Sequence, residues 1–302
     1  MFIINHKRIF LTISAFIVLA SIVAIATYGL KLGIDFKGGS LMEVSYTNTR
    51  PALEKVTEAV GTLMLGETII QESGDKDIVV KSRDLTETER ASLVETLSIK
   101  KEFAVTEKSY TSIGPSVGTE LARKSIISII LVILAIIAFI AFAFRHVSRP
   151  VASWKYGLIA VVTLAHDIII PSGVFALLGH FHGAEVDTLF VVALLTVLGL
   201  SVSDTIVVFD RIRENLKLHV GETFAETVGK SLSQTFTRSI NTSLTVIIAL
   251  LALFFFGPVT TKNFALVLVV GMFFGTYSSI FVASPILVLV GNHELKKSKG
   301  KK

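Results

Sequence analysis

A carboxylate stands inside a long apolar stretch of this sequence. Asp204 lies within residues 188–209, which otherwise have the composition of a membrane-spanning helix. An ionised side chain at membrane depth costs at least roughly 3 kcal/mol to insert, so such residues usually face the interior of a helix bundle and carry protons or ions. An opposite charge, Arg238, opens the next apolar stretch. The two side chains therefore predict either a proton relay or a purely structural salt bridge.

A carboxyl group and a guanidinium in apolar surroundings form a proton switch when one can move. Exclusion of water favours the protonated carboxyl, whereas an adjacent guanidinium favours the ionised form. Two arrangements of the helices then couple protonation to conformation. Asp210, further along the same stretch, is expected at the membrane interface beside Arg211 and Arg213, as a helix-end charge or as an accessory relay residue.

His166 and Asp167 form a second ionisable pair, near the middle of the apolar residues 156–178. Histidine titrates near neutral pH, so the pair is a candidate accessory proton relay. The alternative is a polar patch that locks neighbouring helices together. Polar side chains also gather near Asp204 and Arg238, where they either hold water or link helices: Ser201, Ser203, Thr205, Asn241, Thr242, Ser243 and Thr245.

Several kinds of chemistry have no residues to support them. The sequence has 0 cysteines, which excludes disulfides and thiol chemistry. It has no phosphate-binding loop, catalytic triad or metal-ligand signature, so no catalytic residue, metal or cofactor is expected. His180, His182, Glu185 and Asp187 crowd one short segment, but their spacing fits no metal motif and suits an exposed loop. We therefore expect a protein that is not an enzyme, and ATP-driven work would need another subunit.

The composition is that of a polytopic membrane protein, with 51% hydrophobic and 18% charged residues. About 20 apolar residues cross the roughly 30 Å of hydrocarbon in a bilayer. Six stretches meet this need: residues 9–29, 126–144, 156–178, 189–209, 240–257 and 264–290. The first has no cleavage site after it and is interpreted as an anchor. In the last, the spacing of Gly271 and Gly275 predicts close helix packing.

Lysine and arginine set the expected orientation, because cytoplasmic loops carry an excess of both. Residues 180–187 have none, and residues 258–263 have one. Basic residues gather instead before the first span, in the tail after residue 295, and in the other two loops: Arg145, Arg149 and Lys155, then Arg211, Arg213, Lys217 and Lys230. Both termini are therefore expected in the cytoplasm. The predicted organisation is a cytoplasmic start with the first helix (1–30), an extracytoplasmic α+β domain (31–122), a five-helix region (123–291) and a basic cytoplasmic tail (292–302).

Residues 31–122 alternate between strand and helix patterns. Thr49 is the predicted N-cap of a first helix, and Thr86 with Glu89 fits a capping box for a second. The resulting order β-α-β-β-α-β is that of a ferredoxin-like domain. Its strands are predicted over residues 40–46, 67–72, 77–83 and 103–110, and its helices over 49–64 and 86–99.

A second connection, residues 211–237, is long and partly apolar. We expect it to extend the fourth spanning helix and then to lie on the membrane surface as an amphipathic segment.

Four motifs point to a known family. Gly33-Ile-Asp-Phe-Lys-Gly-Gly39 follows the first span, and Ile113-Gly-Pro-Ser-Val-Gly-Thr-Glu-Leu121 precedes the second. Leu164-Ala-His-Asp167 lies in the third span, and the motif of residues 203–215 ends the fourth. With its six spans and large first loop, nearly the whole chain resembles the SecF subunits of the SecD/SecF family, which are similar to half of an RND-superfamily transporter. The chain stops soon after the sixth span, and so resembles a separate SecF rather than a SecD–SecF fusion.

The resemblance implies a function. SecF pairs with SecD, works with the SecYEG channel, and uses the proton motive force to help unfolded preproteins cross the bacterial cytoplasmic membrane. The resemblance also implies that Asp204 and Arg238 are the proton-relay residues. Ser203 stands where the family commonly has Asn, a small polar exchange.

The glycine motif after the first span has two interpretations. Asp35, Phe36, Gly38 and Gly39 belong to it, and the stretch is either a hinge or a tight turn into the first strand. Membrane lipid is a further expected partner of the Lys-rich tail, and nucleic acid is not expected. Half of an RND-type small-molecule exporter and a passive translocase scaffold remain alternatives, and the coupling ion is either H⁺ or Na⁺.

Overall fold

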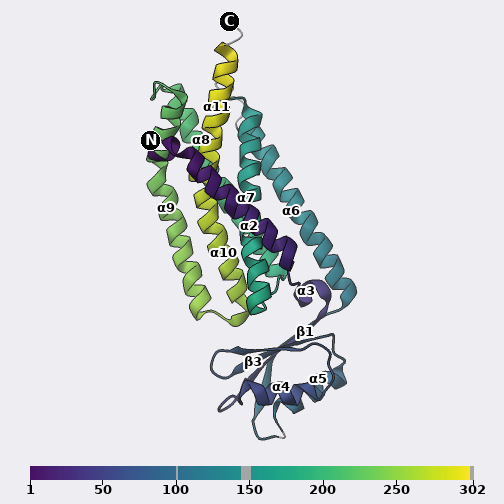
Figure 1. Cartoon of the computed structure of the whole chain (residues 1–302). Coiled ribbons are helices and arrows are strands. Elements are labelled where there is room, and N and C mark those ends of the chain that lie inside the picture. Colours follow the sequence, from purple (N-terminus) through teal and green to yellow (C-terminus); the bar gives the residue numbers. More distant parts are fainter. Residues whose placement is uncertain (100, 144–150, 300–302) are drawn as a thin grey trace.

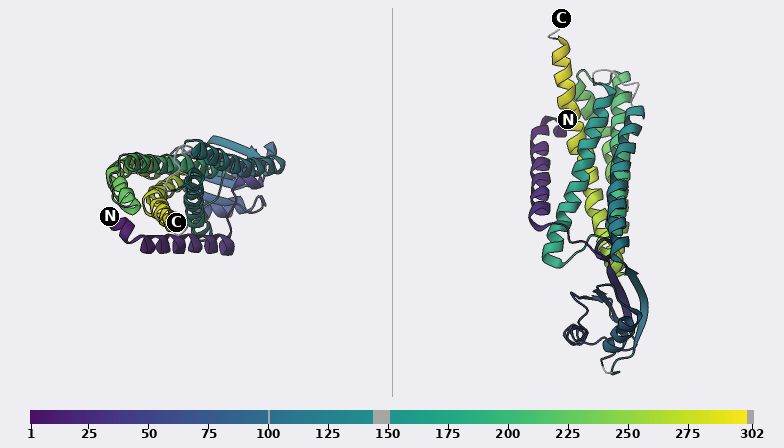
Figure 2. Two further views of the ribbon diagram at one scale, coloured as in Figure 1. Left: turned by 90° about the horizontal axis from the view of Figure 1, so that it is seen from above. Right: turned by 90° about the vertical axis from the view of Figure 1, so that its right-hand side faces the viewer.

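The protein is a bundle of long helices with a small α+β domain at one end (Figure 1). The structure, a computed structural model, describes residues 1–99, 101–143 and 151–299. Within these ranges six helical segments are long and apolar enough to cross a membrane, as the sequence predicts. The N-terminus and the last described residues, up to Lys299, lie toward the end of the bundle away from the sheet (Figures 1 and 2). Before the first long helix stands one short turn, α1 (Phe2–Asn5).

The spanning helices pack mainly around α7, α8 and α10, whereas α6 and α9 expose most of their length. The sixth segment is continuous, because α10 passes through a π-helical turn, η1, into α11. The bounds are α2 (Lys7–Tyr28), α6 (Pro115–Ala143), α7 (Ser153–His182), α8 (Thr188–Lys217), α9 (Phe224–Phe256), α10 (Val259–Ser278), η1 (Ser279–Ala283) and α11 (Ser284–Lys299).

The α+β domain has the predicted ferredoxin-like topology. Its four strands are antiparallel in the order β2-β3-β1-β4, and α4 and α5 lie together on one side of the sheet (Figure 1). The capping box is confirmed: Thr86 Oγ1 accepts from the Glu89 N–H at 3.3 Å, and Glu89 Oε2 accepts from the Thr86 N–H at 2.9 Å. The elements are β1 (Gly39–Tyr46), α4 (Leu53–Gly61), β2 (Ile69–Ser73), β3 (Asp77–Ser82), α5 (Glu87–Leu97) and β4 (Val105–Ile113).

The predicted N-cap at Thr49 is wrong, because α4 begins at Leu53 with Ala52 as its N-cap. Pro51 disfavours the helical region for the residue before it. Arg50 is also held away from a helix: its guanidinium bonds the Gly74 carbonyl at 2.9 Å and pairs with Glu72 at 2.8 Å. The chain therefore stays irregular until Pro51 has passed.

The expected surface helix after the fourth span is also wrong, although α8 does extend to Lys217. The Thr223 hydroxyl accepts from the Glu226 N–H at 3.2 Å and starts α9, which continues directly into the fifth span. Val228 and Leu232 are buried in the bundle core instead of facing a membrane surface.

The two predicted ends of the second spanning helix differ in how they compare with the structure. Helix α6 begins at Pro115, inside the range predicted for the α+β domain. Its predicted end at residue 144 lies outside the described residues. The same holds for Arg145, Arg149 and the last lysines of the tail, which the predicted orientation uses.

Candidate functional site

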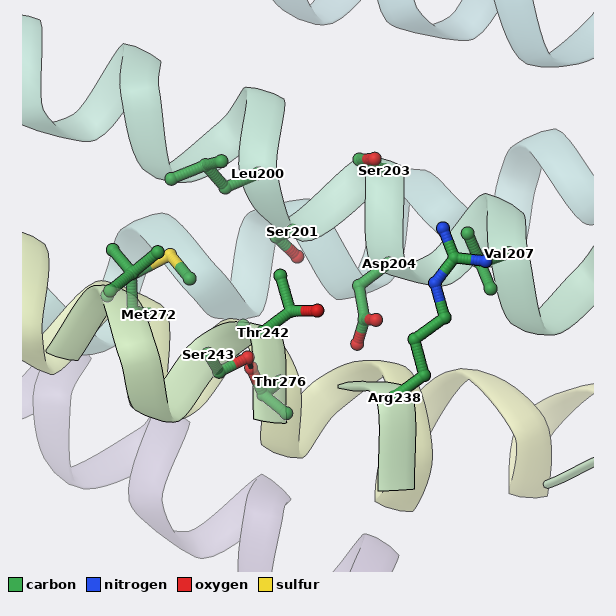
Figure 3. Close-up of a pocket in the computed structure, with 13 residues that line it drawn as sticks. Leu200, Ser201, Ser203, Asp204, Val207, Arg238, Thr242, Ser243, Met272 and Thr276 are labelled. Carbon is green, nitrogen blue, oxygen red and sulfur yellow. Dashed lines mark hydrogen bonds between the residues drawn. The ribbon is translucent and has the colours of Figure 1, made fainter. Parts of the chain in front are cut away.

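The predicted relay residues line one cavity between α8, α9 and α10 (Figure 3). The cavity measures about 110 Å³, which is room for several water molecules. Asp204 and Arg238 face it, together with a set of small hydroxyl side chains: Ser201, Ser203, Thr242, Ser243 and Thr276. Asn241 and Thr245, which the sequence groups with these residues, do not line it.

Asp204 is held by a hydroxyl and not by a direct ion pair. Ser239 Oγ on α9 donates to Asp204 Oδ1 at 2.5 Å, whereas Oδ2 is buried and accepts no hydrogen bond from the described residues. Arg238 faces the same space (Figure 3), yet no carboxylate of the described chain lies within 4.0 Å of its guanidinium. The two charges are thus neighbours across a small polar space, without the contact of a structural salt bridge.

Glycines set the width of the cavity. A side chain at Gly271 would collide with Val197, and one at Gly275 would meet Ser201 at 3.0 Å. Helices α8 and α10 therefore approach closely, as the glycine spacing predicts. Hydroxyl pairs complete this contact, with Thr205 Oγ1 2.8 Å from Ser279 Oγ.

His166 and Asp167 lie behind this cavity and are also buried, with exposed fractions of 5% and 0%. Their side chains contact each other at 2.9 Å between Nδ1 and Oδ1. Asp167 also accepts hydrogen bonds from Ser201 on α8 and Ser278 on α10, so it joins three helices.

Asp210 stands apart from these groups. Its side chain is exposed and pairs with Arg213 Nη2 at 2.6 Å, one turn further along α8. It does not line the cavity. This geometry is that of a local ion pair on the surface of α8, which continues to Lys217, so Asp210 does not stand at a helix end.

The glycine motif joins the α+β domain to the bundle. The one-turn helix α3 (Ile34–Lys37) contacts α6, and Phe36 packs in the bundle core. Asp35 Oδ2 accepts a hydrogen bond from the Thr188 N–H at 2.8 Å, at the first residue of α8.

The two glycines that end the motif have backbone conformations that side chains rarely adopt: φ is +82° at Gly38 and +140° at Gly39. Any side chain on Gly39 would meet the Ser82 carbonyl oxygen at 2.6 Å.

The short segment that contains His180, His182, Glu185 and Asp187 lies at the same junction and contributes contacts to it. Glu185 pairs with Lys81 of β3 at 2.7 Å, and Asp187 Oδ1 accepts the Phe190 N–H at 2.8 Å as the N-cap of α8. His180 packs against the Tyr28 ring. No group of three metal-ligand side chains occurs in the parts of the chain that the structure describes.

Sequence reasoning missed two hydroxyls that bond the carboxylates of Asp204 and Asp167, those of Ser239 and Ser278. Ser239 directly follows Arg238, so its position on the turn that faces Asp204 is a usable signal. Ser278 and Ser279 form a polar pair inside the last apolar stretch, and the π-helical turn η1 starts there. Polar pairs inside apolar stretches thus merit the same scrutiny as charges.

Comparisons with known proteins agree on one family. The family model "Protein export membrane protein SecD/SecF, C-terminal" matches residues 93–293, and "SecD/SecF GG Motif" matches residues 23–49. Protein translocase subunit SecF of Thermobaculum terrenum is 42% identical, over 95% of this chain and 92% of the relative. The SecF of Anaerolinea thermophila is 37% identical, over 95% and 93%.

Solved structures indicate the same family. The crystal structure of SecDF, a translocon-associated membrane protein from Thermus thermophilus, matches with a TM-score of 0.81 and 30% identity, over 96% of this chain and 38% of that one. SecDF in a super-membrane-facing form matches with a TM-score of 0.72 and 29% identity, over 99% and 40%. The chain therefore spans well under half of each SecDF chain.

Proposed function

This chain belongs to the SecD/SecF family of protein export membrane proteins, and from that premise we propose that it is a proton-driven SecF subunit. With a SecD-like partner it uses the proton motive force to promote preprotein translocation through a SecYEG channel. The coupling ion is H⁺, and Asp204 and Arg238 carry the relay.

The observation that carries this proposal is the state of Asp204. A structural salt bridge would place a guanidinium nitrogen on the carboxylate, whereas here a serine hydroxyl holds one oxygen and the other has no partner among the described residues. The cavity beside it has room for water. A carboxylate with a free oxygen, a water-sized space and a nearby cation can bind and release a proton.

Exposure of Arg238 supports a partner subunit. In the isolated chain this side chain is exposed, and so are its apolar neighbours on α9, such as Leu244 and Ile248. A lone guanidinium facing lipid at membrane depth costs several kcal/mol, so such groups face protein or a polar cavity. A SecD-like subunit that covers this face of α8 and α9 would close the relay site.

The remaining assignments follow from this function. The protein resides in the bacterial cytoplasmic membrane with both termini in the cytoplasm, and the α+β domain (31–122) is extracytoplasmic, where unfolded preprotein emerges. The helices of residues 123–291 hold the relay, and the basic tail (292–302) meets anionic lipid.

The test compares two carboxylates of one helix. In membrane vesicles that hold the complex, Asp204→Asn is expected to reduce gradient-driven translocation at least about tenfold, the scale of a typical coupling free energy. Asp210→Asn makes the same chemical change outside the cavity and is expected to stay within about twofold of the wild type, as surface substitutions do.

Co-purification of the SecD-like chain shows whether each variant assembles. An assembled Asp204→Asn complex with full gradient stimulation contradicts the proposal and favours a passive scaffold. Translocation that follows a Na⁺ gradient at constant pH contradicts the choice of ion.

A further inference from the structure

A second polar centre lies behind the Asp204 cavity, and the relay as proposed does not use it. Asp167 is fully buried and accepts three hydrogen bonds. His166 Nδ1 donates to Oδ1 at 2.9 Å, Ser278 Oγ donates to Oδ2 at 2.9 Å, and Ser201 Oγ makes a short bond to the same oxygen. A polar patch that only links helices needs no ionisable side chains, yet this patch contains two, His166 and Asp167.

Ser201 connects this centre to the cavity. Its hydroxyl donates to Asp167, while the same side chain lines the cavity that Asp204 faces. Ser201 precedes Asp204 by one turn of α8. A hydroxyl can donate one proton and accept another at the same time, so it can pass a proton between groups on its two sides.

The packing around Ser201 and Ser278 leaves little freedom to these contacts. Gly275 of α10 lies against the Ser201 side chain, which is 4% exposed. Ser278 is the last residue before the π-helical turn η1, and its hydroxyl is fully buried. Single π-helical turns within α-helices occur frequently at functional sites.

The surroundings of His166 and Asp167 contain few other charges. From α10, Tyr277 stacks over the His166 ring with 6.3 Å between centroids, and from α2 the Ser14 hydroxyl bonds Tyr277 Oη at 3.3 Å. Asp204 and Arg238 face the centre only across the cavity. Throughout the described ranges no lysine or arginine nitrogen lies within 4.0 Å of Asp167. Within that distance, His166 is therefore the one basic side chain beside Asp167 among the described residues.

We propose that His166 and Asp167 form a second proton-binding station, connected to the Asp204 cavity through the Ser201 hydroxyl. This inference extends the proposed function and rests on it. His166 Nε2 is buried and has no hydrogen-bond partner among the described residues, so within these residues the His166 ring hydrogen-bonds Asp167 alone.

The proton transfer between the cavity and Asp167 needs no further reactant. Ser201 Oγ accepts a proton from protonated water in the cavity and passes its own hydroxyl proton to Asp167 Oδ2. The loaded pair is neutral, either as a carboxylic acid beside a neutral imidazole or as a carboxylate beside an imidazolium. The reverse transfer returns the proton to the cavity, where Asp204 takes it up.

His166→Asn separates titration from structure. Asparagine places an N–H donor where Nδ1 stands and so keeps the bond to Asp167, but it binds no proton. In vesicles holding the complex with its SecD-like partner, we expect gradient-driven translocation to fall about tenfold. The pH of half-maximal rate is expected to move by about one unit, a tenfold change in proton concentration. A wild-type rate and pH profile in an assembled complex overturn the proposal.

Ser201→Ala tests the connection itself, and it is the variant to use if His166→Asn does not assemble. It removes one oxygen from a tightly packed site and is expected to match the loss in the His166 variant, with no further loss when the two are combined. Thr205→Val is the matched control, because it removes another buried hydroxyl of α8 that bonds Ser279 and not Asp167. Equal effects of Ser201→Ala and Thr205→Val overturn the connection.

Asp204→Asn keeps the two proposals distinct. If it abolishes gradient stimulation while His166→Asn and Ser201→Ala change nothing, the station is wrong and the relay at Asp204 stands. If Asp204→Asn leaves stimulation intact, the proposed function fails, and with it the station that rests on it.

Discussion

The protein holds partly or fully buried carboxylates in two regions, and their hydrogen-bond partners differ between the two. At the junction between the α+β domain and the bundle, each carboxylate has a fixed partner: Lys81 for Glu185, and backbone N–H groups for Asp35 and Asp187. In the bundle core, Asp167 and Asp204 are held by serine hydroxyls. Carboxylates at the junction thus have partners that only donate hydrogen bonds, whereas those in the core have hydroxyl partners that can also accept them.

The difference lies in what the partners can do. A lysine or a backbone N–H only donates, so its bond favours the ionised form of the carboxylate and fixes the position of the accepting oxygen. A serine hydroxyl donates to an ionised carboxylate and accepts from a protonated one, after a rotation about a single bond. The partners at the junction therefore favour one arrangement, whereas the serine partners in the core are compatible with the change of protonation that our proposal requires.

Gly39→Val gives the largest expected effect on the junction. A β-branched side chain at φ +140° is strained, and its Cβ would meet the Ser82 carbonyl at 2.6 Å. Together these effects cost about 3 kcal/mol or more. Thermal unfolding of the purified protein in detergent is expected to show a lower Tm. Gly61→Ala, at a helical glycine with open space around it, is the control and should keep or raise Tm. A Gly39→Val variant as stable as the wild type would mean that the junction is not rigid.

Lys81→Met tests whether the junction pair is fixed. The Lys81 and Glu185 side chains are 19% and 10% exposed, so removing the lysine leaves a mostly buried carboxylate unpaired. We expect a loss of about 2 kcal/mol, below the range for fully buried pairs. Adding Glu185→Gln should recover most of it. The same Tm measurement checks both, and an additive double variant would show that the two residues act independently.

Asp187→Asn gives the smallest effect, and its sign depends on pH. Burial raises the pKa of the Asp187 carboxyl, and Asp35 raises it further, against the lowering by the Phe190 N–H and Lys81. A folded-state pKa above the unfolded value means that stability is greatest below the unfolded pKa and falls as pH rises through the folded one. Asparagine keeps an oxygen at the N-cap, so the variant should lose this fall. Tm curves of the two proteins that stay parallel across acidic to neutral pH would contradict the assignment.

The sequence predicts the spans and the ferredoxin-like order well, because both rest on patterns of many residues. Predictions for single residues are less accurate. Thr49 has the right type for an N-cap but stands before Pro51, and Arg50 is held by the β2–β3 hairpin, a contact between distant residues. Asp204 and Arg238 are found from charge alone, whereas Ser239 becomes visible only when α8 and α9 are packed together.

The connection between Leu32 and Val186 has a mechanical consequence. These residues form a parallel bridge, in which Gly33 N–H bonds the Val186 carbonyl and Val186 N–H bonds the Lys31 carbonyl, both at 2.8 Å. The segment that enters the α+β domain is thereby clamped to the residue just ahead of the α8 N-cap. We expect a tilt of α8 to be passed through this backbone link to the α+β domain, so that a displacement near Asp204 would also move the sheet.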